Sequence, residues 1–300
     1  MRVSRWGWSS YETEAALSAE AQRLSTHVAV APRRSDAEIL TVNSGTRVDA
    51  ALLDQAPSAR LVLTTTSGFD HLDLDVIRAR GIVAGRCPMA RRDAVVESAL
   101  GLLLDGLRCH RPLTTASRAG RWARSDLPAL GMRLLGGATV GVVGFGVIGK
   151  RMVQVLELLG ATVVVHDPGV HPASVPLDTL ARTCDAVTLH CRLEPGSRRL
   201  IDDAWLSNAR GLVLVNTARG DIVDVDATPG HLDAGHLSYL GLDVFPTEPW
   251  PRLEASQHPR VAYLPHAAGF HVGLNTAVAT ELEAAVEAFV AGDPIPHRVA

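Results

Sequence analysis

The stretch VVGFGVIGKRMVQVLELLGATVVVHDPG, from Val142 to Gly169, decides the fold. An apolar run leads into the pattern Gly-x-Gly-x-x-Gly at Gly144, Gly146 and Gly149, and a helical segment and a second apolar run follow, ending at Asp167. The glycine pattern alone is weak, because glycines also occupy ordinary strand-to-helix turns. With strand, helix, strand and acid in order, the stretch favours a dinucleotide-binding βαβ unit.

The residues of this unit have separate physical roles. Gly144 allows the tight turn, Gly146 lets the backbone approach a pyrophosphate, and Gly149 lets helix and strand pack closely. The pyrophosphate would lie on the free N–H groups where the helix begins. Asp167 would accept hydrogen bonds from an adenosine ribose and repel a 2′-phosphate, so NAD is preferred over NADP. The alternative is that Asp167 only forms a turn before Pro168.

Composition points to a globular protein with small-molecule partners. The 300 residues are 47% hydrophobic, and 29 basic against 32 acidic residues give a net charge of −3. This balance offers no electrostatic footprint for nucleic acid or an anionic membrane. The four cysteines form no short metal-binding or disulfide spacing, so we expect no metal site and free thiols in a reducing cytoplasm. The start of the chain does not resemble a signal peptide, which also favours a cytoplasmic protein.

Two series of apolar runs alternate with helical segments, which predicts α/β structure with parallel sheets. The first series extends from Val28 to Gly85 and the second begins near Ala138. We expect two doubly wound domains, Rossmann-like or flavodoxin-like, with a cleft between them. Residues 1–103 plus about 275–300 would form a substrate-binding domain, and residues 104–274 the NAD-binding domain. The stretch DAVVESALGLLLDGLRCHRP predicts a bridging helix that stops at Pro112.

Polar residues follow three later strands of the second series, where ligands of such sheets bind. Arg219 follows VLVNTA, Asp243 and Glu248 lie in LGLDVFPTEP, and His266 lies in VAYLPHAAG. Arginine can hold a carboxylate bidentately, histidine can exchange a proton near neutral pH, and glutamate can orient the imidazole and raise its pKa. These groups suffice for hydride transfer on a 2-hydroxy acid. Taken singly, each is also typical of a surface arginine, a solvated carboxylate or an ordinary histidine.

At this point the chain resembles the D-isomer-specific 2-hydroxyacid dehydrogenases. The resemblance rests on TVGVVGFGVIGK, AVTLHCRLEPGSRRLID, LVNTARGDIVD, LGLDVFPTEP and LPHAAG in that order, with weaker support upstream from TSGFDHLDLDVIRARGI and AVVESALGLLL. It covers about residues 60 to 300, and the first 25 or so match nothing. Two departures are the arginines Arg91 and Arg92 ahead of the bridging helix and a segment after residue 226 that is broken by proline and glycine.

The resemblance implies roles for individual residues. Arg219 would bind the substrate, Glu248 would be the carboxylate partner, and His266 the catalytic acid/base. Asp243 would hydrogen-bond the nicotinamide carboxamide. A first-domain loop would grip the substrate carboxylate through Ser67, Gly68 and Phe69. Further residues are expected beside the cofactor: Val147, Ile148, His190, Cys191, Thr217, Ala218 and Gly269.

The expected function is therefore an NAD-dependent oxidoreductase that interconverts a D-2-hydroxy acid and its 2-oxo acid. By resemblance it would be a homodimer formed through the helix around Val95 to Leu107. Two alternatives stay open. One is an NADH-sensing binding protein of the same fold, like the co-repressors of the family. The other is an enzyme for a phosphorylated acid, whose anionic tail Arg91 and Arg92 would face unless they are solvated loop residues.

Overall fold

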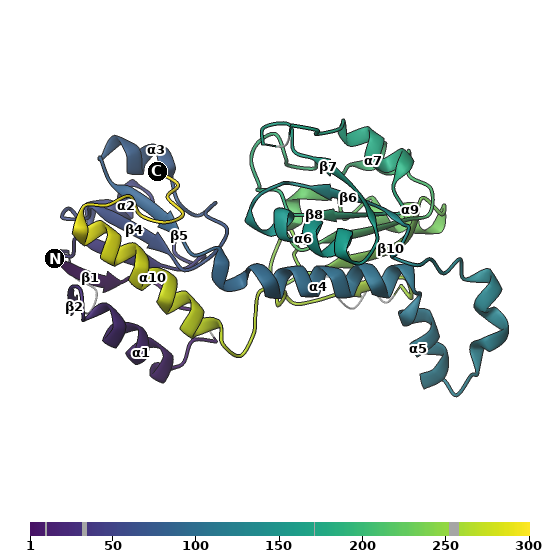
Figure 1. Cartoon of the computed structure of the whole chain (residues 1–300), viewed down its shortest axis with the longest axis horizontal. Coiled ribbons are helices and arrows are strands. Elements are labelled where there is room, and N and C mark those ends of the chain that lie inside the picture. Colours follow the sequence, from purple (N-terminus) through teal and green to yellow (C-terminus); the bar gives the residue numbers. More distant parts are fainter. Residues whose placement is uncertain (10, 32–34, 171, 252–257) are drawn as a thin grey trace. The chain divides into compact units, whose positions relative to one another are not determined.

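A computed structural model describes residues 1–9, 11–31, 35–170, 172–251 and 258–300 (Figure 1). The chain divides into two compact units. The first comprises Met1–Arg92 and Phe270–Ala300, and the second comprises Asp93–Gly269. The boundaries expected from the sequence, near residues 103 and 274, lie further along the chain than this division.

The first unit is built on a five-stranded parallel sheet in the order β2-β1-β3-β4-β5. The pairings among these five strands are parallel, and β5 also forms an isolated antiparallel bridge between Gly85 and Arg298. Its strands are β1 (Arg2–Arg5), β2 (Ala29–Ala31), β3 (Ile39–Val42), β4 (Leu61–Thr64) and β5 (Val83–Arg86). Its helices are α1 (Glu14–Leu24), α2 (Ala50–Asp54), α3 (Leu74–Ala79) and α10 (Leu274–Ala291). This strand order is that of flavodoxin-like sheets.

Local sequence explains where these elements begin. Side chains of Thr13, Asp49 and Asp73 accept hydrogen bonds from the first-turn N–H groups of α1, α2 and α3. These residues are preferred N-caps because they satisfy otherwise unpaired donors. Strands β3 and β4 are buried at every position, since helices cover both faces of the sheet.

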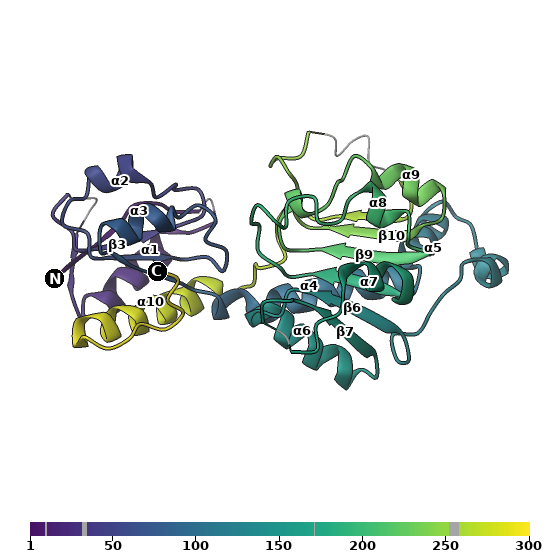
Figure 2. The ribbon, with the colours of Figure 1, turned by 90° about the horizontal axis from the view of Figure 1, so that it is seen from above.

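Helices from both ends of the chain cover one face of this sheet. Helix α10 packs beside α1 (Figure 1), and α2 and α3 lie on the opposite face (Figure 2). Leu274, Val278 and Leu282 of α10 share a core cluster with Ile39 and Leu61 of the central strands. The first unit is therefore discontinuous in sequence, with α10 supplying part of its core.

The second unit contains a six-stranded parallel sheet in the order β11-β10-β9-β8-β6-β7. Its strands are β6 (Thr139–Val143), β7 (Thr162–His166), β8 (Ala186–Leu189), β9 (Leu212–Asn216), β10 (Leu237–Leu242) and β11 (Val261–Tyr263). After β7 the chain crosses back over β6 to form β8, so the sheet has a switch point at the carboxyl ends of β6 and β8. The prediction of two doubly wound parallel sheets is confirmed.

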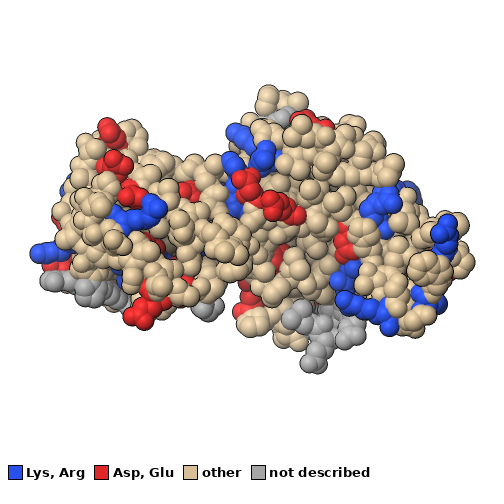
Figure 3. Space-filling view, turned by 60° about the horizontal axis from the view of Figure 1, so that its bottom comes forward, with Lys and Arg blue, Asp and Glu red and all other residues tan. Residues whose placement is uncertain are grey.

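Helices also cover both faces of this second sheet. One core cluster joins the sheet to α4 (Met89–Leu107) and α6 (Val147–Leu158). The other joins it to α7 (Leu177–Thr183), α8 (Asp203–Leu206) and α9 (Thr228–Asp233). The remaining helical segments are α5 (His110–Arg118), η1 (Ala123–Ala129) and η2 (Gly220–Ile222). On the face drawn in Figure 3, acidic and basic side chains are scattered among uncharged ones.

The bridging helix differs in length from its prediction. Helix α4 ends at Leu107 rather than at Pro112, because Cys109 adopts a left-handed conformation with a φ of 52°. Pro112 lies in the first turn of α5 instead, where its missing N–H group costs no helical hydrogen bond. Within the described residues, none of the helices is long and apolar enough to span a membrane.

Candidate active site

Two glycines shape the turn between β6 and α6. Gly144 has a φ of 94°, and a Cβ atom there would lie 2.5 Å from the backbone nitrogen of Cys191. A Cβ atom on Gly149 would lie 1.9 Å from the carbonyl oxygen of Gly144. Only glycine fits both positions. The pattern thus brings the end of β6 against the end of β8, at the switch point of the sheet.

Helix α6 begins without a side-chain cap. Its N-cap is Gly146, and a Cβ atom there would meet nothing within 4 Å. Val147 and Ile148 form the first turn and are half-buried. Because the N-terminus of a helix presents unpaired N–H groups and a positive dipole end, it attracts anions. The open space at Gly146 therefore fits a pyrophosphate.

Asp167 is a half-buried carboxylate that follows β7. Its Oδ2 accepts a hydrogen bond of 2.7 Å from the N–H group of Phe145, inside the glycine turn. Its own N–H group donates to Oγ of Ser174 at 2.9 Å. A carboxylate can accept about four hydrogen bonds, so Asp167 retains acceptors for ribose hydroxyls while it is anchored to the turn.

Buried groups lie at the ends of β8 and β9. Burial lowers the pKa of His190 to about 4, so its ring is neutral near neutral pH, and it raises the pKa of Cys191 to about 12. Oγ1 of Thr217 is buried and has no hydrogen-bond partner among the described residues. A buried hydroxyl without a hydrogen-bond partner destabilises the folded state, unless a ligand supplies that partner. Thr217, the uncapped helix and Asp167 together fit NAD.

His266 and Glu248 form a hydrogen-bonded pair. Nδ1 of His266 lies 2.7 Å from Oε2 of Glu248, and Oε1 of Glu248 accepts a 3.0 Å bond from the N–H group of Phe245. The His266 side chain is 51% exposed. No hydrogen bond to its Nε2 occurs in the described part of the chain. The second ring nitrogen is thus available to a substrate.

The pair perturbs the pKa values of both side chains. The hydrogen bond to Glu248 outweighs burial and raises the pKa of His266. Burial alone would raise the pKa of Glu248, but hydrogen bonds from His266 and from the Phe245 N–H group outweigh it and lower that pKa. Both shifts favour an imidazolium beside a carboxylate.

Asp243, at the end of β10, holds the backbone around His266. Its carboxylate accepts hydrogen bonds from the N–H groups of Ala267 at 2.7 Å and Ala268 at 3.0 Å. Its carbonyl oxygen accepts a 2.8 Å bond from the N–H group of His266. Burial raises the pKa of Asp243 despite these bonds. The sequence predicted a cofactor contact for Asp243 and gave no sign of this second role.

Arg219 lies in the loop after β9. Asn216 fixes that loop, since its Nδ2 donates to the carbonyl oxygen of Arg219 at 2.8 Å and its Oδ1 accepts from the N–H group of Ala218 at 3.0 Å. A Cβ atom on Gly220 would lie 1.9 Å from the carbonyl carbon of Phe245. The two loops therefore touch, and the charge of Arg219 acts on the pKa of Glu248. The second unit thus brings the three predicted catalytic residues to one edge of its sheet.

The loop with Ser67, Gly68 and Phe69 follows β4 in the first unit. Arg86 donates to the carbonyl oxygen of Ser67 at 2.8 Å, and its guanidinium carbon lies 5.3 Å from the centre of the Phe69 ring. Oγ1 of Thr66 donates to the carbonyl oxygen of Gly68 at 2.7 Å. The described residues offer no acceptor to the N–H groups of Ser67 and Gly68. The substrate-binding role of this loop stays a prediction.

Arg91 and Arg92 lie on the first turn of α4 and are half-buried. Arg91 donates to the carbonyl oxygen of Thr65 and, at 3.0 Å, to the hydroxyl of Tyr11. Arg92 donates to the sulfur of Met89 at 3.9 Å. Through these hydrogen bonds Arg91 connects the start of α4 to the loop after β4, so it is not a solvated loop residue.

Three supporting residues were missed from the sequence: Asn216, Arg86 and Ser98. Oγ of Ser98, on α4, donates at 3.1 Å to the carbonyl oxygen of Ala268, just before Gly269. Asn216 lies in the quoted motif LVNTARGDIVD, just ahead of Arg219, so its position was a usable signal. Arg86 and Ser98 act across long stretches of sequence, and nothing local indicates their partners.

Comparison with known proteins places this geometry in a family. Residues 100–268 match the model described as D-isomer specific 2-hydroxyacid dehydrogenase, NAD binding domain. The match spans more than half of the chain and includes the glycine turn, Asp167, Arg219, Glu248 and His266. It confirms the prediction of an NAD-binding domain.

Two curated relatives match most of the chain. Identity is 33% over 273 residues with D-3-phosphoglycerate dehydrogenase of Mycobacterium tuberculosis, covering 88% of this chain and 51% of that protein. It is 30% over 276 residues with glycerate dehydrogenase of Methylorubrum extorquens, covering 88% and 86%. The chain thus spans about half the length of the mycobacterial phosphoglycerate dehydrogenases that it matches. Both relatives are named as dehydrogenases, so the binding-protein alternative is not favoured.

Solved structures share the fold. D-lactate dehydrogenase of Aquifex aeolicus, complexed with NAD and lactic acid, has a TM-score of 0.83 at 23% identity, over 98% of this chain and 96% of that one. A glyoxylate reductase from Paecilomyes thermophila has a TM-score of 0.86 at 23% identity, over 99% and 98%. The family model and the curated relatives show that this chain belongs to the D-isomer specific 2-hydroxyacid dehydrogenase family.

Proposed function

We propose that the protein is an NAD-dependent dehydrogenase that interconverts a D-2-hydroxy acid and its 2-oxo acid. The observation that carries the proposal is the His266–Glu248 hydrogen bond of 2.7 Å beside the loop of Arg219. An oriented imidazole with a raised pKa can exchange a proton, and an arginine can hold a carboxylate. Both groups lie at the sheet edge where ligands of this fold bind.

His266, Glu248 and Arg219 have separate roles in this mechanism. When bound, NADH supplies the hydride that reaches the carbonyl carbon of the oxo acid. Protonated His266 donates from Nε2 to the carbonyl oxygen as negative charge develops there, and Glu248 holds the ring through Nδ1. Arg219 binds the substrate carboxylate and stabilises the same developing charge. In the oxidation direction, neutral His266 accepts the hydroxyl proton.

The direct test is oxidation of NADH, followed by absorbance. The substrate panel contains glyoxylate, hydroxypyruvate, pyruvate, bulkier 2-oxo acids and phosphorylated ones, each repeated with NADPH. We expect turnover on at least one acid with a preference for NADH. Tight NADH binding without turnover on any acid would contradict the enzyme and support a binding protein that senses NADH.

Replacing Glu248 by glutamine should change the pH dependence of the reaction. Glu248 raises the pKa of His266, and reduction requires the protonated imidazole. Reduction is therefore sustained at low pH and lost as pH rises through the pKa of His266. In Glu248→Gln this loss should move to lower pH, and the rate should fall about 10- to 100-fold. The measurement is kcat/KM against pH, with Glu287→Gln on α10 as the control, and an unmoved alkaline limb would contradict the pairing.

Replacing Asp167 by asparagine should weaken the preference for NADH. The amide keeps an oxygen for the Phe145 N–H group but removes the charge that repels a 2′-phosphate. We expect the ratio of kcat/KM for NADH to that for NADPH to fall about 10- to 100-fold, since a hydrogen bond to a charged group contributes about 1.5–3 kcal/mol. Asp178→Asn, at an exposed position on α7, should leave the ratio unchanged. An unchanged ratio in Asp167→Asn would assign cofactor preference elsewhere.

We also propose a homodimer in the cytoplasm. The segment after α4 carries exposed apolar side chains, with Trp122 82% and Leu134 68% exposed. Contiguous patches of exposed apolar side chains mark surfaces that pack in an assembly, and we propose that Trp122 and Leu134 belong to such a patch. The test is analytical ultracentrifugation, in which Trp122→Ser should weaken association and wild-type protein at the monomer mass would contradict the dimer. The four cysteines are free thiols, which supports a reducing compartment.

A further inference from the structure

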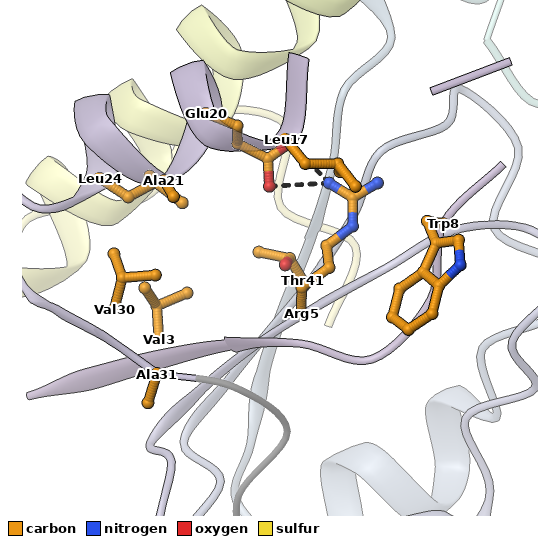
Figure 4. A pocket seen from close by; sticks show the side chains of 10 residues that line it. All are labelled: Val3, Arg5, Trp8, Leu17, Glu20, Ala21, Leu24, Val30, Ala31 and Thr41. Carbon is orange, nitrogen blue, oxygen red and sulfur yellow. Dashed lines mark hydrogen bonds and ion pairs between the residues drawn. The ribbon is translucent and has the colours of Figure 1, made fainter. Parts of the chain in front are cut away.

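The first unit contains a cavity that involves none of the predicted site residues. It measures about 280 Å³ and lies between α1 and the strands β1, β2 and β3 (Figure 4). Trp8 and Val30 border it and are 64% and 42% exposed, so the cavity opens to solvent there. Its volume is close to the lower end of the range for small-molecule sites, about 300–1,000 Å³.

Most of the cavity wall is aliphatic. Val3 of β1 and Leu24 of α1 are each 2% exposed, and Leu17, Ala21 and Ala31 complete the wall. Figure 4 shows the α1 side chains facing the strand side chains across the space. Apart from Trp8 at the mouth, the apolar lining residues are small or branched aliphatic ones, and such a wall suits a short aliphatic body.

One end of the cavity holds an ionic group with unequal charges. Nη1 of Arg5 donates to the two carboxylate oxygens of Glu20 at 2.7 and 2.5 Å, and Nη2 donates to Glu12. The side chains of Arg5, Glu20 and Glu12 are only 15%, 12% and 8% exposed. One cation thus faces two carboxylates, and Glu12 also accepts a hydrogen bond from the N–H group of Ser9. Burial raises the pKa of Glu20 despite Arg5, so the second negative charge of the group is incompletely compensated away from water. Buried charge without a partner is unfavourable.

Thr41 gives a second, independent indication of a ligand. It lies on β3, is 1% exposed and lines the same cavity. Its Oγ1 is buried and has no hydrogen-bond partner among the described residues. Buried hydroxyls are normally paired. Thr41 lacks a hydrogen-bond partner and the Arg5 group lacks a second positive charge, and one ammonium group would supply both.

We propose that this cavity binds a small primary ammonium compound with a branched aliphatic body. The ammonium group would donate to Glu20 and to Oγ1 of Thr41, and would neutralise the excess charge of the Arg5 group. The aliphatic body would lie against Val3 and Leu24. A carboxylate ligand is disfavoured because Arg5 already bonds both glutamates and the carbonyl oxygen of Gly7.

Calorimetric titration of the full chain tests this assignment without cofactor or turnover. The probes are isopentylamine, its neutral analogue isopentanol, the carboxylate isocaproate, and leucine, near pH 8 where the amine is charged. We expect saturable binding of one isopentylamine per chain and at least tenfold weaker binding of isopentanol, because charge-assisted hydrogen bonds are about twice as strong as neutral ones. No saturable binding of isopentylamine, equal binding of isopentanol, or tighter binding of isocaproate or leucine would each overturn the proposal.

Two variants locate the binding site. Ala21→Leu fills the cavity and should abolish binding, whereas the same substitution at Ala19, an exposed position on α1, should not. Thr41→Val keeps the shape of the side chain and should weaken isopentylamine binding about two- to tenfold, the range of one neutral hydrogen bond. Binding that survives both Ala21→Leu and Thr41→Val would place the site elsewhere and overturn the assignment. Because the readout is binding alone, failure here is distinct from failure of the dehydrogenase assay.

Discussion

Replacing His266 by alanine is expected to lower kcat for oxo-acid reduction by about 100- to 10,000-fold, the usual range for loss of a general acid. The imidazole is oriented by the 2.7 Å bond to Glu248, and its other nitrogen faces no described partner. Alanine removes the proton donor but leaves the glycine turn and Asp167 in place. NADH affinity, measured by fluorescence titration, should therefore change little although kcat falls by this factor.

His258 provides the matched control for this experiment. His258 precedes β11 and His266 follows it, so the two histidines lie at opposite ends of one strand. His258→Ala should retain nearly full kcat. If His266→Ala also kept its kcat, or if both variants lost it equally, His266 would not be the proton donor.

Replacing Arg219 by lysine is expected to raise KM for the oxo acid and lower kcat together, with kcat/KM falling about 1,000-fold or more. Lysine keeps the charge but loses the planar fork that binds a carboxylate bidentately. It also moves positive charge away from the developing alkoxide, and loss of one such donor costs about 100- to 1,000-fold in kcat. Steady-state kinetics with the best acid of the panel measure both effects.

Arg210 supplies the control for Arg219. It is exposed and precedes β9, whereas Arg219 follows that strand. Arg210→Lys should match the wild-type constants. A change confined to the KM for NADH in Arg219→Lys would instead assign Arg219 to cofactor binding.

Sequence alone predicted the parts of the site whose partners are close in the chain. Gly144, Gly149 and Asp167 lie in one short βαβ unit, so their order and spacing already imply a turn and an acid at its edge. The pairing of His266 with Glu248 depends on two separate strand ends; chemistry suggested that a glutamate could orient the imidazole, and the family resemblance gave these two residues those roles. The hydrogen bonds that Asp243 accepts from the loop of His266 could not be predicted from the sequence, because they depend on β10 and β11 lying side by side.

The first residues of the chain were the least predictable. Strand β1 has the sequence RVSR, with one apolar residue and the charged Arg5 at its end, so it lacks the apolar pattern of a buried strand. Arg5 is tolerated because Glu20 on α1 pairs with it, and that pairing exists only after the helix packs on the sheet. The cavity beside them depends on the same packing. Similarly, the end of α4 at Leu107 depends on the left-handed backbone of Cys109, which no local pattern indicated.

Because the first unit is discontinuous in sequence, it cannot complete its fold during synthesis until α10 has been made. Strand β5 ends at Arg86, but α10 begins only at Leu274 and supplies part of the core under β3 and β4. At a ribosomal rate of about 5–20 residues per second, that helix emerges roughly 10–40 s after the sheet it covers. In that interval α1 alone covers this face of the sheet and the part that α10 buries stays exposed, whereas all strands of the second unit emerge before α10 does. The nascent first unit therefore depends on chaperone protection, or on remaining unfolded, until its last helix leaves the ribosome.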